Sequence, residues 1–405
     1  MPGLRAQRLA ARRSERRRAV RRHAMVVAAA VVVAVGTVTG MMSALDGTGR
    51  TDEAAPPKVT RSPSLRSLPL MPSPSPSATR STSPTPAAPT PRSEPTPGPP
   101  SPNVTQKTQK TQEQRAAVSA RLYRHPDSQV LDWVRDHLDD PRHAVIRSRI
   151  AEQPAAVWFA DFTPDTITAR VRAVTSGGSA LGRVPVVVPY AVPDRDCGGH
   201  SQGGAPDLDA YDAWIDRFAA GLGSGDVIVI LEPDSIAQSE CLSAGERADR
   251  FASLARAGRA FKTANPRARV YYDAGHSGWN APGKQAEWLR QAGAASPASS
   301  DGVFSNVSNF QDTAAEIAYD RRVLDALGGP AGLGAVIDTS RNGAGAPPDG
   351  EWCDPAGRKL GRAPTVSTGE ARIDAYLWVK LPGESDGCKG RPGTFTASYA
   401  YDLAR

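Results

Sequence analysis

Short runs of β-branched and aromatic residues alternate with segments of helical hydrophobic period from residue 157 onward. Apolar runs bounded by Gly, Pro or Asp are typical of strands, and apolar positions spaced three and four apart are typical of helices. The run Val184-Pro185-Val186-Val187-Val188 is apolar on both faces, as in a parallel sheet that is covered by helices. The pattern predicts strands at 157–162, 184–190, 227–231, 270–273, 302–305, 335–338 and 375–380, and helices at 164–175, 209–221, 244–264, 282–292 and 313–327.

Repeated strand–helix units on this scale form an α/β barrel or a doubly wound parallel sheet, and the periodicity leaves both open. Two of the predicted helices begin with capping-box sequences, Ser243 with Glu246 and Thr313 with Glu316. In either fold a ligand binds at the carboxyl ends of the strands. The residues that follow each predicted strand are therefore the candidates for a functional site.

Carboxylates dominate the positions that follow the predicted strands, and Gly or Pro beside them places these acids on loops. Any one such Asp is equally well explained as a turn former, but acids at several strand ends indicate a shared cleft. The residues at or beyond the strand ends are Tyr190, Glu232, Asp234, Asp273, Asn306, Asp338 and Lys380.

Clustered carboxyl groups with tryptophans nearby suit the hydrolysis of glycosidic bonds. One carboxyl group must be protonated to release the leaving sugar oxygen, while a second activates water or attacks the sugar. Crowded acids raise one another's pKa, which keeps one of them protonated near neutral pH. Aromatic rings provide apolar platforms on which sugar rings stack.

Composition divides the 405-residue chain into three parts. Nine arginines between Arg5 and Arg22 precede an Ala/Val-rich stretch, so residues 1–44 are predicted to be a signal peptide or an N-terminal membrane anchor. Residues 45–117 are rich in Pro, Ser and Thr, and they are predicted to form a disordered linker. All aromatic residues lie at or beyond Tyr123, so residues 118–405 are expected to form one catalytic domain, secreted or anchored at the cell surface.

The net charge of +7 is also distributed unevenly. Residues up to Arg115 include 18 basic and 6 acidic side chains, whereas the rest of the chain has 31 and 36. The basic excess therefore belongs to the N-terminal extension, and no nucleic-acid partner is expected for the folded part. Contact with a membrane is expected only through residues 1–44.

All four cysteines lie in the part that is predicted to fold, and an even number in an exported chain predicts two disulfides. Of the three pairings, we favour Cys197–Cys241 with Cys353–Cys388, because each then ties together loops that carry candidate catalytic groups. The chain has no CxxC motif and its histidines are scattered, so neither a metal nor a cofactor is expected.

Taken together, the motifs resemble glycoside hydrolase family 6, the inverting cellulases. The resemblance runs from about Tyr123 to the C-terminus in the family's order. It implies a distorted, incomplete parallel β/α barrel, a β-1,4-glucan substrate and the sequential disulfide pairing. The motifs are Val188-Pro189-Tyr190, Arg195-Asp196-Cys197-Gly198, Leu231-Glu232-Pro233-Asp234, Asp273-Ala274-Gly275-His276, Asp338-Thr339-Ser340-Arg341, Glu351-Trp352-Cys353 and the segment from Lys380 to Gly387.

The resemblance also implies roles for individual residues. Asp234 matches the proton donor, and Asp196 matches the carboxylate that keeps this acid protonated and positions water. Asp386 matches the proposed base, for which a water chain toward Asp196 is the rival account, and Tyr190 matches the tyrosine that crowds the distorted sugar. The residues that match sugar-contacting or cleft-supporting positions are Trp158, Asp273, His276, Trp279, Asn306, Trp352, Lys380 and Glu384.

Two departures from the family pattern bear on water binding and on the mode of action. Where some members have a serine that holds the water, this chain has Gln202, and Ser201 is taken as the equivalent. After Trp279 no second tryptophan of the kind found in cellobiohydrolases follows, which favours an open cleft. We therefore expect a monomeric endo-β-1,4-glucanase. The alternatives are an exo-acting cellobiohydrolase of the same family and a catalytically silent carbohydrate-binding surface protein.

Overall fold

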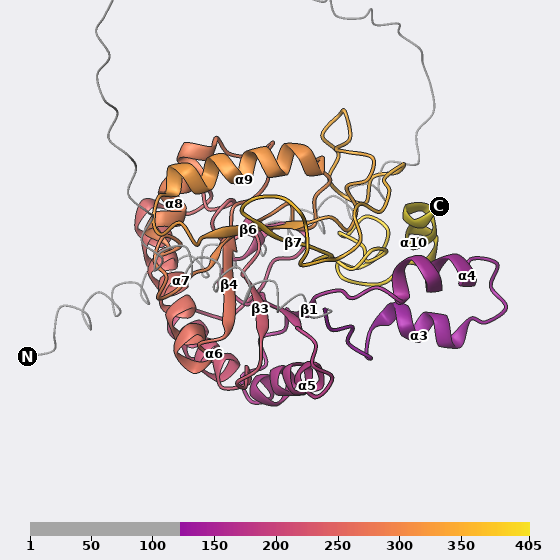
Figure 1. Ribbon diagram of the computed structural model, residues 1–405, viewed down its shortest axis with the longest axis horizontal. Coiled ribbons are helices and arrows are strands. Elements are labelled where there is room, and N and C mark those ends of the chain that lie inside the picture. The colour runs from indigo at the N-terminus through magenta and orange to yellow at the C-terminus, as the bar shows by residue number, and fades with distance from the viewer. Residues whose placement is uncertain (1–121) are drawn as a thin grey trace, which may run out of the picture. The chain divides into compact units, whose positions relative to one another are not determined.

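The computed structural model describes residues 122–405, and the predicted signal or anchor and the linker lie outside this range (Figure 1). Seven parallel strands form one sheet in the order in which they occur along the chain. All seven predicted strands are confirmed, although the last begins and ends earlier than expected. The strands are β1 (Val157–Phe159), β2 (Val186–Pro189), β3 (Val227–Leu231), β4 (Ala268–Asp273), β5 (Gly302–Ser305), β6 (Gly334–Asp338) and β7 (Ile373–Leu377).

Helices follow most of the strands and lie on the outside of the sheet (Figure 1). The prediction of five such helices is confirmed. They are α5 (Ile167–Ala180), α6 (Leu208–Ala219), α7 (Ala244–Ala264), α8 (Pro282–Gln291) and α9 (Thr313–Leu327).

The sheet curls until its two outer strands approach each other without pairing as neighbours. Within the described residues, β1 and β7 are the ends of the strand order. The backbone N–H of Ala156 nevertheless donates to the carbonyl oxygen of Trp378 at 2.9 Å, and the indole N–H of Trp158 donates to that of Val379 at 2.7 Å. The expected distorted, incomplete β/α barrel is therefore confirmed.

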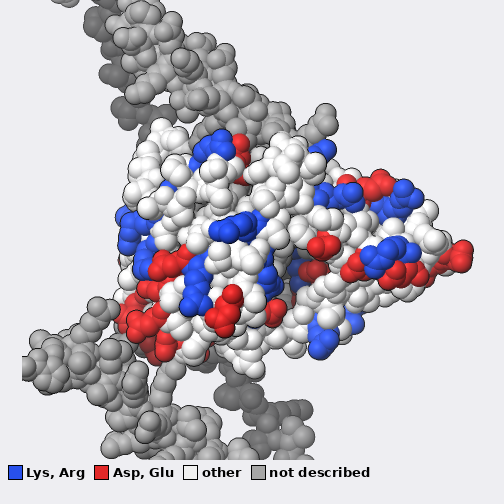
Figure 2. Space-filling model, turned by 90° about the horizontal axis from the view of Figure 1, so that it is seen from below, with Lys and Arg blue, Asp and Glu red and all other residues white. Residues whose placement is uncertain are grey.

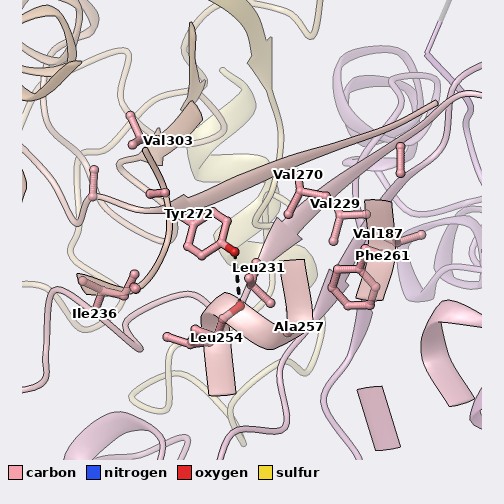
Figure 3. Packing of buried hydrophobic residues seen from close by; sticks show 14 of the residues in the cluster. Val187, Val229, Leu231, Ile236, Leu254, Ala257, Phe261, Val270, Tyr272 and Val303 are labelled. Carbon is pink, nitrogen blue, oxygen red and sulfur yellow. Dashed lines mark hydrogen bonds between the residues drawn. The ribbon is translucent and has the colours of Figure 1, made fainter. Parts of the chain in front are cut away.

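Alternating strand residues form two apolar layers, one on each face of the sheet. Val186, Val188 and other residues of the same parity fill the inside of the curled sheet. Residues of the opposite parity, such as Val187 and Val229, pack beneath the helices. Figure 3 shows this outer layer against α7, where the Tyr272 hydroxyl donates to the Leu254 carbonyl oxygen at 3.1 Å. Both layers are buried, as the doubly apolar strand pattern predicts.

One of the two predicted capping boxes is confirmed and the other is wrong. Ser243 and Glu246 cap α7 reciprocally. At α9 the preceding Asp312 is the cap, and its side chain accepts from the N–H groups of Ala314 and Ala315. Because the Asp312 carboxylate, one position before Thr313, caps the helix, Glu316 is not needed as a capping residue and its side chain is buried in the protein.

Three further helices were not predicted, and they pack together beside the last strand (Figure 1). They are α3 (Gln129–Asp136), α4 (His143–Ile146), which continues into the π-helical turn η1 (Arg147–Ala151), and α10 (Ala397–Ala404). In the described part of the chain, no helix is both long and apolar enough to cross a membrane. Figure 2 shows acidic and basic side chains interspersed over one face of the domain.

Candidate active site

A cleft of about 1070 Å³ opens where the strands end, and it is lined by residues from distant parts of the chain. Eleven of the thirteen predicted catalytic and substrate-binding residues line it. These eleven are Trp158, Tyr190, Asp196, Ser201, Asp234, His276, Trp279, Trp352, Lys380, Glu384 and Asp386.

Asp234 follows β3 at the floor of the cleft, where its side chain is half-buried. Its backbone lies in the left-handed region, with φ of 67°, so the chain turns sharply here and directs the carboxyl group away from the sheet. Burial, and then the negative charges of Asp273 and Asp196, raise the pKa of Asp234 well above its ordinary value. A carboxyl group with these surroundings stays protonated and can donate a proton.

Asp196 lies in η2 (Asp196–Gly198), which belongs to the segment 194–204 that we call the Asp196 loop. Its Oδ2 accepts from the backbone N–H of Ser201 at 2.7 Å and from the Ser201 hydroxyl at 2.9 Å. The Ser201 Oγ also lies 3.0 Å from the Tyr190 hydroxyl. These contacts bring the side chains of Asp196, Ser201 and Tyr190 together at one place in the cleft.

Tyr190 follows β2 and is held by aromatic and cationic neighbours. The Trp158 ring meets it edge-on at 5.2 Å, and the Arg195 guanidinium lies 4.4 Å from its ring centre. Burial and the charge of Asp234 raise the pKa of Tyr190, so the phenol remains neutral. Beneath it, the buried Glu232 carboxylate accepts from the backbone N–H groups of Ala191 and Val192 and holds the backbone in place.

Asp386 lies on the segment 384–393, which we call the Asp386 loop, and both of its carboxylate oxygens have partners. Oδ2 accepts from the fully buried Arg341 guanidinium at 2.7 Å and from the Asp354 N–H at 3.1 Å. Oδ1 lies 3.5 Å from the Lys380 ammonium. The carboxylate is thus one member of a buried ionic cluster with Arg341 and Lys380.

Aromatic side chains form the walls of the cleft. Trp352 and Trp279 are 53% and 37% exposed, which is unusual for tryptophan and leaves their faces available to a ligand. The His276 ring lies 5.2 Å from that of Trp279. Burial lowers the pKa of His276 to about 4, and its Nδ1 accepts from the Gly278 N–H, so the imidazole is neutral near pH 7.

Lys380 and Glu384 line the cleft beside Asp386. Burial raises the pKa of Glu384 to about 7, although the Lys380 charge opposes this shift. The Lys380 ammonium also donates to the Ser385 carbonyl oxygen at 3.2 Å. Gln129 of α3 donates to the Gly393 carbonyl oxygen and accepts from the Phe395 N–H, which joins the unpredicted helix to the rim of the cleft.

Two of the predicted residues lie behind the cleft rather than in its lining. The Asp273 carboxylate accepts from the backbone N–H groups of Ile236, Ala237 and Gly275, so it fixes the loop after Asp234. The buried Asn306 amide donates to the Asp338 carbonyl oxygen at 2.9 Å. Asp273 and Asn306 therefore occupy supporting positions, and neither is arranged to touch a ligand directly.

The predicted disulfides Cys197–Cys241 and Cys353–Cys388 are both present, with Cα–Cα separations of 5.9 and 5.8 Å. The first fastens the Asp196 loop to the segment before α7, and the second fastens the Asp386 loop beside Trp352. The buried Asp354 accepts from the N–H groups of Asp386, Cys388 and Lys389 and so completes the second loop. Asp354 and Arg341 were not among the predicted site residues, although Arg341 lies within the motif Asp338-Thr339-Ser340-Arg341.

A curled parallel sheet with carboxyl groups and tryptophans around a long cleft defines a glycoside hydrolase. Residues 113–401 match the model of glycosyl hydrolases family 6, and the chain belongs to this family. It is similar to endoglucanase 1 of Streptomyces sp. (strain KSM-9), with 51% identity over 71% of this chain and 79% of that protein. It is also similar to endoglucanase A of Thermobispora bispora, with 47% identity over 71% of this chain and 62% of that protein.

Solved structures agree with this assignment. The structure of the endoglucanase Cel6 from Mycobacterium tuberculosis, in complex with a methyl-cellobiosyl-4-deoxy-4-thio-β-D-cellobioside, matches 70% of this chain and 96% of its own. The TM-score is 0.65 and the identity is 38%. An exo-acting relative, exoglucanase-6A of Humicola insolens, is 28% identical over 65% of this chain and 63% of its own length.

Proposed function

We propose that this chain is an exported endo-β-1,4-glucanase that cleaves internal bonds of cellulose or β-glucan by single displacement, with inversion. The observation that carries the proposal is Asp234, a carboxyl group kept protonated by burial and acidic neighbours at the floor of a tryptophan-lined cleft. The similarity to endoglucanases at 51% and 47% identity supports the endo mode, since the exoglucanase is only 28% identical.

In the proposed reaction, Asp234 donates its proton to the glycosidic oxygen as the bond to the leaving sugar breaks. Tyr190 crowds the sugar at the cleavage point, which favours a distorted ring close to the transition state. The exposed faces of Trp352 and Trp279 support sugar rings, and Trp158 supports the ring on the glycone side. Lys380, Glu384 and His276 supply polar contacts at the walls.

The attacking water approaches the opposite face of the sugar and must lose a proton. The pair formed by the Ser201 hydroxyl and Asp196 is arranged to hold such a water and to accept its proton through a water chain. Asp386 is the alternative base. Because Arg341, Lys380 and the Asp354 N–H occupy its oxygens, its geometry supports the route toward Asp196.

Asp234→Ala tests the proton donor. We expect kcat on barley β-glucan to fall by about 10²–10⁴-fold. Activity on an aryl cellobioside with a good leaving group should fall far less, because that leaving group needs no proton. The products of the wild-type enzyme on cello-oligosaccharides should appear first as the α-anomer in NMR spectra. Unchanged activity of the variant on β-glucan, or initial β-anomer, would disprove the mechanism.

Carboxymethylcellulose separates the three candidate activities. An endoglucanase lowers the viscosity early, when few reducing ends have been formed. A cellobiohydrolase releases soluble sugar with little early loss of viscosity, and a silent binding protein does neither. We expect the first result, and either of the others would replace the proposal.

Export is supported by the two disulfides of the described domain, which form in oxidising compartments. Residues 1–44 are proposed to direct export as a cleaved signal peptide or as an uncleaved anchor. Fractionation of the producing cells with an antibody to the domain distinguishes the two, since only the anchored form remains with the membrane. Recovery of the domain in the cytoplasm would contradict both.

A further inference from the structure

The tip of the Asp196 loop carries a histidine that none of the proposed steps uses. His200 lies directly before Ser201, and its ring contacts a distant part of the chain. The ring centre lies 5.6 Å from that of Trp352, with the two planes tilted by 53°. This contact joins the loop after β2 to the segment before β7, and both line the cleft.

Two further contacts surround the same imidazole. A Cβ placed on Gly387 would meet the ring at 2.9 Å, so His200 packs directly on the backbone of the Asp386 loop. A ring nitrogen lies within 4.8 Å of the sulfur atoms of both Cys353 and Cys388. These sulfurs form a disulfide, which has no thiolate to offer a metal ion, so the group is a packing site for the ring.

A glycine is required at position 387, in part because the His200 ring lies against its backbone. Its φ of 134° is one that side chains rarely adopt, and any Cβ would also occupy the space of the imidazole. The exposed His200 ring therefore contacts the Trp352 ring, the Gly387 backbone and the Cys353–Cys388 disulfide. We call these three groups the His200 seat.

The position of His200 connects this seat to the reacting groups. The next residue, Ser201, donates to Asp196 through both its N–H and its hydroxyl, and it contacts Tyr190. Gly198 and Gly199, which directly precede His200, have no side chain that could anchor the tip. Adjacent side chains thus contact different groups, since Ser201 binds the Asp196 carboxylate and His200 contacts the seat.

We propose that His200 is a positioning residue, which holds the tip of the Asp196 loop on the Asp386 side of the cleft so that Ser201 and Asp196 face the attacking water. The inference rests on the proposed hydrolysis and names the contact that keeps its water-binding pair in place. Its basis is ring packing, and the imidazole transfers no proton in the reaction.

His200→Ala removes the ring and leaves the seat empty. An aromatic contact of this kind shifts the balance between a docked and an undocked loop by roughly 2- to 12-fold. We therefore expect kcat on β-glucan to fall about 3- to 10-fold with KM changed less than about 2-fold, the signature of lost positioning rather than lost binding. His200→Phe keeps a planar ring on Trp352 and should restore most of the wild-type kcat.

The matched control is His137→Ala. His137 stacks on Trp133 at 5.0 Å, the same pair of residue types, and it is absent from the cleft lining. We expect its kcat and KM to equal those of the wild type. If His200→Ala keeps wild-type kcat, or if His200→Phe is as impaired as His200→Ala, the positioning role is wrong; the second result would indicate that the imidazole itself takes part in the chemistry.

Hydrogen exchange gives a readout that does not depend on catalysis. The Ser201 N–H is protected by Asp196, and undocking of the tip exposes it to solvent. Exchange in a peptide that spans 198–204 should accelerate about 3- to 10-fold in His200→Ala and remain unchanged in His200→Phe and His137→Ala. Unchanged exchange in His200→Ala would overturn the positioning role, whether or not the wild-type protein cleaves β-glucan. If exchange accelerates in the variant but the wild-type protein is inactive, only the proposed function is refuted.

Discussion

The Asp386 carboxylate belongs to a buried ionic cluster, so its substitution affects more than a proton transfer. Its partner Arg341 is completely buried, and a buried guanidinium without a counter-charge is strongly destabilising. Removing the Asp386 carboxylate therefore changes the stability of the domain as well as the site. A loss of activity on substitution would not by itself identify this residue as the base.

For Asp386→Ala we expect the free energy of unfolding to fall by about 3–5 kcal/mol, because Arg341 is left unpaired. Urea denaturation followed by intrinsic fluorescence measures this directly. The matched control is Asp325→Ala, since the Asp325–Arg372 ion pair lies at the surface and should contribute less than about 1 kcal/mol. Equal, small losses in the two variants would show that the buried cluster does not depend on Asp386.

At the scale of secondary structure, local patterns predicted the elements whose apolar face meets the sheet. The ends of α7, α9, β3 and β5 coincide with the prediction. A capping box marks the start of α7, and continuous buried apolar runs mark the two strands. The helices α3, α4 and α10 were missed because they bury their apolar residues mainly against one another and beside β7. Their stability comes from tertiary packing, which no local window contains.

The differences near the site have the same origin. The last strand was predicted to extend to Lys380, but its pairing ends at Leu377, because its partner β6 ends at the opposite residue, Asp338. Glu316 resembles a capping residue in the sequence, yet it accepts from the Ser277 N–H at 2.8 Å and braces the loop that holds His276 and Trp279. The acids at strand ends were predictable from topology, whereas these long-range partners were not.

The Arg341–Asp386 ion pair is a long-range contact that the sequence alone does not predict. The two residues are 45 positions apart, and neither carries a local signal for burial. A buried arginine is recognisable only once its counter-ion is placed beside it. The loop acids of the site and Lys380 were thus found from the sequence, whereas Arg341 was found only from the fold.

For the whole domain, the buried acids make stability depend on pH in a defined direction. Burial raises the pKa of Glu232 from 4.5 to about 7, and Asp234 and Asp320 are shifted in the same direction. Between pH 4.5 and about 7, Glu232 is protonated in the folded protein and ionised in the unfolded chain, so the folded protein binds more protons. The stabilisation is fully present below about pH 4.5 and is lost as the pH rises through about 7. His276 opposes this trend, since its lowered pKa costs stability only below its ordinary value of 6.5.

Glu232→Gln should make the dependence of stability on pH less steep. In the wild type the Glu232 shift alone corresponds to a loss of roughly 3 kcal/mol between pH 4.5 and 7.5. Gln does not titrate, so the variant should lose less stability over this range, and its amide oxygen can still accept from the N–H groups of Ala191 and Val192. Urea midpoints at several pH values measure the slope, with Glu152→Gln, an exposed glutamate, as the control. A Glu232→Gln slope equal to that of the wild type would mean that Glu232 is already ionised in the folded protein at pH 4.5, held by the N–H groups of residues 191 and 192.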